Sequence, residues 1–143
     1  MKDSEEIRWL FLEASPSAVN EWTKKMWVKM GDIQVFKDPT RTLCMAVAEE
    51  SAAGELFCVG EILFSECEVL YRGRKFSGRA LFDDSPRALA LALLEAAITL
   101  APNVLNEMAE EFEMEKQRLE EVRQKTSRAL GSTRVTFETM NLT

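Results

Sequence analysis

Near the start of the chain, apolar residues recur with the period of a helix. The first set is spaced three or four residues apart: Ile7, Leu10, Phe11 and Ala14. This spacing predicts an amphipathic helix over residues 2–14. Ser15-Pro16-Ser17 interrupts the pattern, and a second helix is predicted over residues 17–30, with Gly31 as its end. The three tryptophans all lie in this helical pair, where we expect core or interface packing: Trp9, Trp22 and Trp27.

From residue 32 onward the apolar period changes to two, which is typical of half-buried strands. One alternating run includes Leu43, Met45 and Val47, and a loop follows at residues 51–54. A long run at residues 56–71 contains Gly60, which indicates a bulge or bend. After a turn at residues 72–74, residues 76–82 are predicted as another strand. Short turns between successive strands predict an antiparallel meander.

The second half of the chain returns to helical patterns. Residues 87–100 are apolar nearly all round, so this helix is predicted to be covered on several sides and to lie at the centre, between the sheet and the next helix. That long amphipathic helix is predicted from residues 101–103 to about residue 129, ended by Gly131, with a strand at residues 133–140 after it. The sequence therefore predicts one α+β domain over residues 1–143: two N-terminal helices, a β-meander, an apolar central helix, a long amphipathic helix and a C-terminal strand.

Composition excludes several classes of function. The chain has no histidine, so neither a Ser-His-Asp triad nor a histidine-ligated metal is expected. Its three cysteines lack a C-x-x-C spacing, and no glycine-rich phosphate loop is found. A net charge of −6 disfavours nucleic acid and anionic membranes as partners. The acidic, polar start and the absence of a long apolar run predict a soluble, cytoplasmic protein without a membrane span.

Four groups of residues could carry chemistry, and each has a simpler explanation. The pair Asp83-Asp84 precedes Ser85-Pro86, so helix capping explains it as well as a paired-carboxylate site does. Three carboxylates could bind a cation or line a solvated strand: Glu61, Glu66 and Glu68. Four basic residues could meet a phosphate, an acidic partner or only solvent: Arg72, Arg74, Lys75 and Arg79. The cysteines are expected to behave as small buried apolar residues: Cys44, Cys58 and Cys67.

Two stretches together resemble a known family. Leu56-Phe57-Cys58-Val59-Gly60-Glu61-Ile62-Leu63 leads through an arginine–glycine turn to an alanine-rich helix ending in Leu94-Glu95-Ala96. Near the C-terminus stands Ser132-Thr133-Arg134-Val135-Thr136-Phe137-Glu138-Thr139-Met140. These residues resemble the PhnG family, the G subunit of the bacterial carbon–phosphorus lyase system of phosphonate metabolism. The resemblance extends over residues 39–140 and is most specific in the terminal motif.

The resemblance implies a component of a multi-subunit enzyme. Similar proteins assemble with the H, I and J subunits and support the displacement of adenine from ATP by a phosphonate, which yields a ribose-1-phosphonate 5-triphosphate. The resemblance supplies no catalytic, cofactor-binding or metal-binding residue for this chain. This agrees with the absence of a histidine, a metal-ligand spacing and a phosphate loop in the sequence. The alternatives are a stand-alone small enzyme or ligand-binding domain, and a homo-oligomer joined along Leu105–Val122.

The C-terminal strand is the predicted interface. Alternation places Val135, Phe137 and Thr139 on one face of the strand. Together with the rest of the motif this gives the predicted interface residues: Thr133, Arg134, Val135, Phe137, Thr139 and Met140. Such a strand can be added to the sheet edge of a partner, or it can complete the protein's own sheet.

Deleting the residues after Ser132 tests this interface. We expect a folded, soluble product whose melting temperature is nearly unchanged but which no longer co-purifies with the I subunit. The reason is that the deletion removes only the strand that binds the partner. Co-purification and thermal melting measure the two effects. An unfolded product would assign the strand to the protein's own sheet, and retained binding would place the interface elsewhere.

Overall fold

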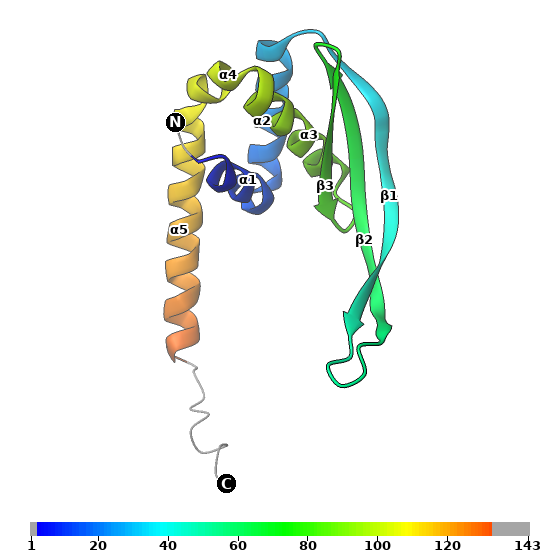
Figure 1. Cartoon of the computed structure of the whole chain (residues 1–143). Coiled ribbons are helices and arrows are strands. Elements are labelled where there is room, and N and C mark those ends of the chain that lie inside the picture. The colour runs from blue at the N-terminus through cyan, green and yellow to red at the C-terminus, as the bar shows by residue number, and fades with distance from the viewer. Residues whose placement is uncertain (1–2, 133–143) are drawn as a thin grey trace.

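The computed structural model describes residues 3–132 and has an α+β fold, as predicted. Its three strands form one antiparallel sheet in the order β1-β2-β3, which confirms the meander. In chain order the elements are α1 Ser4–Glu13, α2 Pro16–Met30, β1 Ile33–Glu49, β2 Leu56–Tyr71, β3 Arg74–Leu81, α3 Ser85–Leu100, α4 Pro102–Glu107 and α5 Ala109–Ser132. Figure 1 shows the sheet at one side of the molecule and α5 at the other, with α3, α2 and α1 between them.

The two N-terminal helices have the faces that the sequence predicts. Ile7, Leu10 and Phe11 of α1 are buried, and so are Trp22 and Met26 of α2. The corner between the two helices provides the N-terminal cap of α2. The Ser15 hydroxyl accepts a hydrogen bond from the backbone N–H of Ala18 at 3.2 Å, and Pro16 occupies the first turn. Trp22 is buried as expected, whereas Trp9 and Trp27 are only partly covered.

The strands are long, and only part of their length belongs to the core. β3 pairs with β2 from Tyr71 back to Phe64, while β1 pairs with β2 along its whole length to Leu56. The register shifts opposite Gly60, between Ala46 and Val47, which confirms the predicted bulge. The far parts of β1 and β2 therefore form a two-stranded hairpin that projects beyond the rest of the sheet (Figure 1).

The apolar helix α3 lies at the centre of the fold, as predicted. Leu93, Leu94 and Ala97 are completely buried. One side of α3 packs on β2 and β3, and the other is covered by α1 and α2. The prediction that the long helix covers this second side holds only for its first part, α4, which also contacts α3; it is wrong for α5, because α1 and α2 stand between α3 and α5 (Figure 1).

The approach of α3 to the sheet depends on Gly78 of β3. A Cβ atom on Gly78 would lie 2.2 Å from the backbone oxygen of Ala88 and 2.3 Å from the backbone nitrogen of Ala92. Backbone rather than a movable side chain thus occupies the space that any other residue would need. Glycine here, opposite the small residues of α3, lets the helix backbone rest on the strand.

The predicted long helix is divided in two. It breaks at Met108, whose side chain is completely buried, so that α4 and α5 are separate helices. The sequence has no glycine or proline at this break, and the apolar spacing continues through it. Gly131 does not end the second helix, which continues to Ser132. The predicted strand at residues 133–140 lies outside the described residues.

Three aromatic rings attach α5 to the N-terminal helices. The ring centroid of Trp22 lies 5.0 Å from those of both Phe11 and Phe112, and Phe11 and Phe112 are 5.6 Å apart. Edge-to-face and tilted pairs at these distances stabilise a junction beyond the area that they bury. Within residues 3–132, no helix has both the length and the apolar character needed to cross a membrane.

Replacing Gly78 by alanine tests the contact between α3 and the sheet. We expect Gly78→Ala to lower the free energy of unfolding by about 3 kcal/mol or more, since the new methyl group meets helix backbone. Urea denaturation measures this change. Gly60→Ala is the matched control, because a Cβ there meets nothing within 4 Å and we expect a change below about 1 kcal/mol. Equal effects of the two substitutions would contradict the close approach.

Candidate interaction surface and pocket

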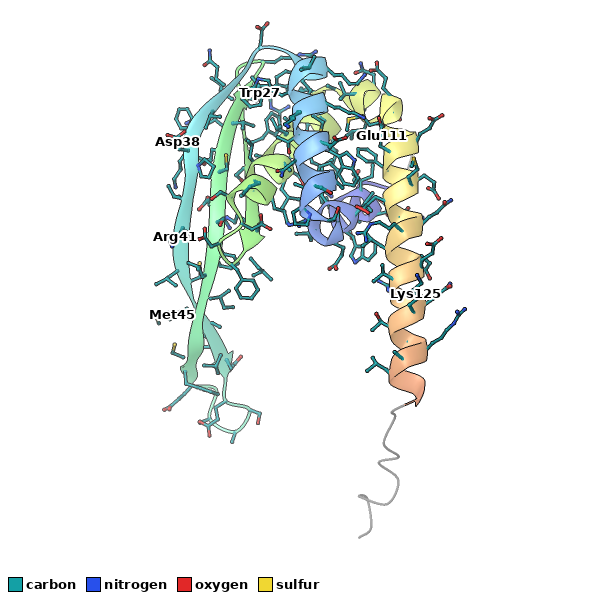
Figure 2. The ribbon with its side chains drawn as sticks, turned by 180° about the vertical axis from the view of Figure 1, so that it is seen from behind. Trp27, Asp38, Arg41, Met45, Glu111 and Lys125 are labelled. Atoms are coloured by element: carbon teal, nitrogen blue, oxygen red, sulfur yellow. The ribbon has the colours of Figure 1, made fainter. Side chains whose placement is uncertain are left out.

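The projecting part of the β1–β2 hairpin is the most exposed apolar region described. We call residues 42–62 the hairpin arm. Its apolar side chains include Met45, which is 64% exposed, and Leu56, which is 72% exposed. The sequence pattern predicted half-buried strands here, and this prediction is wrong for the arm. Figure 2 shows Met45 on the part of β1 that extends past the helix packed on the sheet.

A difference in length explains why the arm is uncovered. β2 and α3 each contain 16 residues. At a rise of about 3.3 Å per strand residue and 1.5 Å per helix residue, the strand spans ~53 Å and the helix only ~24 Å. A helix of this length therefore covers less than half of the strand on which it packs.

The face that α3 covers near the body continues along the arm without a cover. Ser65 of β2 is completely buried on the side of the helices, and its partner in β1 is Arg41. Because side chains alternate along a strand, Leu43, Met45 and Val47 follow Arg41 on the same face. Leu63 pairs with Leu43 and adds to this face. A contiguous exposed apolar face of this kind is typical of a protein–protein contact.

The cysteines do not behave alike. Cys67 is completely buried, as expected, and burial raises the pKa of its thiol, with smaller contributions from the nearby negative charges of Asp38 and Glu68. Cys44 and Cys58 lie on the arm and are exposed, so the prediction that all three are buried is wrong for these two. They are free thiols, and their partners in the register, Ile62 for Cys44 and Val47 for Cys58, place them on opposite faces.

The three carboxylates of β2 do not converge. Glu66 lies beside Arg79, with 3.4 Å between the Glu66 Oε1 and Arg79 Nη2 atoms, and Glu68 follows on the same face. Glu61 lies on the other face of the sheet, where its partner in β1 is Met45. Across residues 3–132, no three Asp, Glu, Cys or His side chains are grouped as metal ligands. The solvated-strand interpretation fits this arrangement better than a cation site does.

Asp83 and Asp84 have different partners: Asp84 caps the start of α3, whereas Asp83 lies beside Arg41 of β1. Asp84 Oδ1 accepts a hydrogen bond from the backbone N–H of Arg87 at 3.3 Å, and Asp84 Oδ2 accepts one from its Nε atom at 2.7 Å. The other nitrogens of Arg87 donate to the carbonyl oxygens of Phe11 and Ala14, at the end of α1. Asp83 lies 3.8 Å from Arg41. The capping interpretation therefore holds for Asp84.

Each residue of the basic group has an intramolecular partner. Arg72 donates to the carbonyl oxygen of Leu100 at 2.9 Å and lies over the ring of Tyr71. Lys75 lies 3.8 Å from the centre of the Phe36 ring. Arg74 stacks on Phe76 and Arg79 pairs with Glu66. These contacts spread the four charges over different parts of the sheet, so they do not form one phosphate site.

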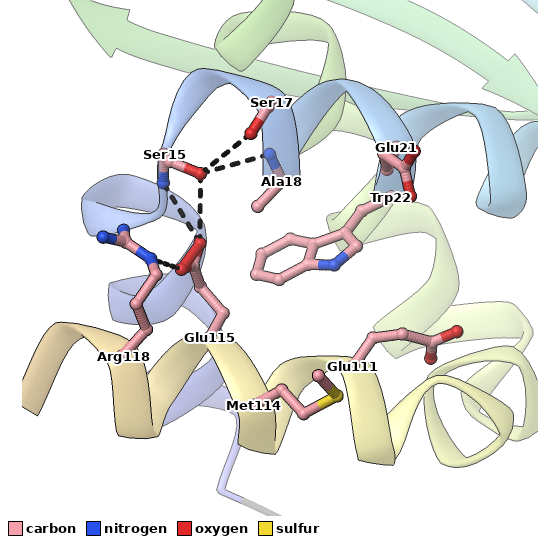
Figure 3. Close-up of a pocket in the computed structure, with 9 residues that line it drawn as sticks. All are labelled: Ser15, Ser17, Ala18, Glu21, Trp22, Glu111, Met114, Glu115 and Arg118. Carbon is pink, nitrogen blue, oxygen red and sulfur yellow. Dashed lines mark hydrogen bonds and ion pairs between the residues drawn. The ribbon is translucent and has the colours of Figure 1, made fainter.

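A pocket of about 530 Å³ lies between the start of α2 and the first half of α5 (Figure 3). Its most buried carboxylate is Glu115, only 7% exposed. Glu115 accepts hydrogen bonds from the Ser15 hydroxyl at 3.2 Å, from the Ser15 backbone N–H at 3.4 Å and from Arg118. These bonds hold α5 against the α1–α2 corner. The sequence did not indicate this contact, since its partners lie 100 positions apart.

The same pocket contains a second carboxylate with a structural partner. Lys25 donates a hydrogen bond to Glu111 Oε1 at 2.6 Å, which lowers the pKa of the Glu111 carboxyl group. This pair joins α2 to α5, and the pair between Lys29 and Glu107 joins α2 to α4. The pocket is therefore bordered by groups that connect helices.

The family model described as "Phosphonate metabolism protein PhnG" matches residues 5–141, nearly the whole chain. The chain belongs to the PhnG family. This confirms the resemblance seen in the sequence and gives the protein a role in phosphonate metabolism. The search of curated proteins gave no match. The predicted PhnG interface residues fall outside the described part of the chain: Thr133, Arg134, Val135, Phe137, Thr139 and Met140.

Thiol alkylation tests the placement of the cysteines. In the native protein we expect iodoacetamide to modify Cys44 and Cys58 but not Cys67, because Cys67 is buried and its raised pKa keeps it a neutral thiol. Peptide mass spectrometry locates the modification. In denaturant all three should react. Modification of native Cys67 at the rate of Cys58 would contradict the described packing of β2.

Proposed function

We propose that this PhnG protein is a non-catalytic subunit of the carbon–phosphorus lyase system. It supports the formation of ribose-1-phosphonate 5-triphosphate from ATP and a phosphonate, as a partner of H-, I- and J-type subunits. The family match over residues 5–141 carries the proposal. The exposed apolar face of the hairpin arm is consistent with a protein that works inside an assembly.

The chemical requirements of the reaction favour a non-catalytic role for this chain. Displacing adenine from ATP requires a site that holds a triphosphate and a group that stabilises the departing base. The described basic residues near the sheet are separated and already paired, and the chain as a whole is acidic. The most buried carboxylate, Glu115, is engaged in the Ser15 and Arg118 contacts. We therefore assign triphosphate binding and acid–base catalysis to the other subunits.

The two alternatives fit the structure less well. A homo-oligomer joined along Leu105–Val122 would need an exposed apolar row, but Leu105, Met108 and Phe112 are buried within the chain itself. A stand-alone ligand-binding site made from Glu61, Glu66 and the basic group would need these residues on one surface. Glu61 and Glu66 lie on opposite faces of the sheet.

An adenine-release assay tests this assignment. We expect the purified chain alone to release no adenine from ATP and methylphosphonate, because its sequence has no histidine base and no glycine-rich phosphate loop. Release should appear when the chain is combined with the H, I and J subunits and the ATPase-like subunit, and should fall when this chain is left out. Turnover by the chain alone, or full turnover without it, would refute the proposal.

A further inference from the structure

The hairpin arm has one edge without a neighbouring strand. β3 ends beside Phe64 of β2, where the backbone N–H of Phe82 donates to the carbonyl oxygen of Leu63 at 2.7 Å. From Ile62 back to Leu56, β2 is paired with β1 on one side, and the described part of the chain places no strand on the other. Alternate N–H and C=O groups along this edge are therefore open to a further strand.

Exposed strand edges are usually protected by charge on the edge itself. Lysine is the residue most used for this purpose. From Leu56 to Ile62 this edge has no lysine, and its one charged residue is Glu61. The apolar residues Leu56, Phe57 and Val59 are all at least half exposed, and Ile62 follows them. Together with Leu43, Met45 and Val47 they give the arm apolar side chains on both strands. An edge of this composition favours strand addition by a partner.

The charge of the region specifies what kind of partner fits. From residue 42 to residue 71 the chain contains no lysine or arginine. Six glutamates occur in this span, and four of them lie in the arm: Glu49, Glu50, Glu55 and Glu61. Three of these glutamates lie beside the exposed turn at its tip, and only Glu61 lies farther along the arm, so the negative charge is concentrated at the end of the arm. A complementary surface is apolar inside and basic at its rim.

We propose that the hairpin arm inserts into an apolar site rimmed by lysine and arginine on another subunit of the same assembly. A strand of that subunit pairs with the free edge of β2 between Leu56 and Ile62. This inference rests on the proposed function and names the surface through which the chain takes part. Negatively charged membranes and nucleic acid are disfavoured by the glutamates, and two arms of identical chains would bring like charges together.

Full-length variants co-expressed with the H, I and J subunits test the apolar part of the proposal. We expect the double variant Met45→Lys/Val47→Lys to bind the subunit assembly ~10–100-fold more weakly than wild type, as for loss of a buried interface centre. Both side chains are exposed in the isolated chain, so its melting temperature should stay within about 2 °C. Val28→Lys on α2 is the matched control, since Val28 is 81% exposed and distant from the arm, and its binding should be unchanged.

A second pair of variants tests the charge. Glu49→Lys/Glu55→Lys should weaken binding and reduce its sensitivity to salt, because a basic rim would then meet lysine. Glu13→Lys, on the exposed end of α1, is the control, because it makes the same change of charge away from the arm.

Hydrogen exchange tests the edge directly: alternate amides of residues 56–62 should exchange quickly in the isolated chain and at least ~10-fold more slowly in the assembly.

The outcomes separate the two proposals. If wild type does not associate with the other subunits, the proposed function fails, and this inference with it. If wild type associates and the arm variants bind as well as Val28→Lys and Glu13→Lys, only the inference fails. If the isolated chain is a dimer that Met45→Lys/Val47→Lys converts to a monomer, a second copy covers the arm and the proposed partner is wrong.

Discussion

The contact between α3 and Gly78 determines the arrangement of this fold. Helix backbone rests on strand backbone at this point, since a Cβ on Gly78 would fall within 2.2 Å of the Ala88 oxygen. The alanines of α3 are completely buried, and α1 and α2 lie against its second side. Because α3 occupies the space between the sheet and the N-terminal helices, α5 packs on the outer side of those helices (Figure 1).

Polar contacts then secure the elements around that centre. Arg87 joins the start of α3 to the end of α1, and Arg8 of α1 pairs with Glu95 of α3 at 2.6 Å. Ser65 joins the sheet to the loop before α3, donating to the Phe82 carbonyl oxygen and accepting from the Asp84 N–H, both at 2.8 Å. Since these side chains are buried or partly buried and are hydrogen-bonded to other elements, they hold the relative position of the helices and the sheet.

The same geometry leaves surface for other molecules. The body buries its apolar residues between the sheet and the helices, while the hairpin arm and the end of α5 extend from it in the same direction (Figure 1). The two extensions differ in charge. The charged residues of the arm are all acidic, whereas those of residues 122–132 of α5 are all basic: Arg123, Lys125 and Arg128. The molecule therefore has two extensions with chemically distinct surfaces, and the body lies between them (Figure 1).

The sequence by itself determined the order and type of the elements described up to α3, the faces of α1 and α2, the bulge at Gly60, the cap at Asp84 and the family. Each of these depends on neighbouring residues: period, capping residues and turn chemistry act within a few positions. The break at Met108 was not predictable in this way, because the apolar spacing continues through it and no glycine or proline marks it; Met108 and Phe112 are both buried on either side of the new helix start. The exposure of Leu43 and Met45 likewise needed the tertiary structure, since the strand pattern does not reveal where the covering helix ends. Only the packed molecule brings Ser15 to Glu115 across 100 residues of sequence and leaves the arm without a cover.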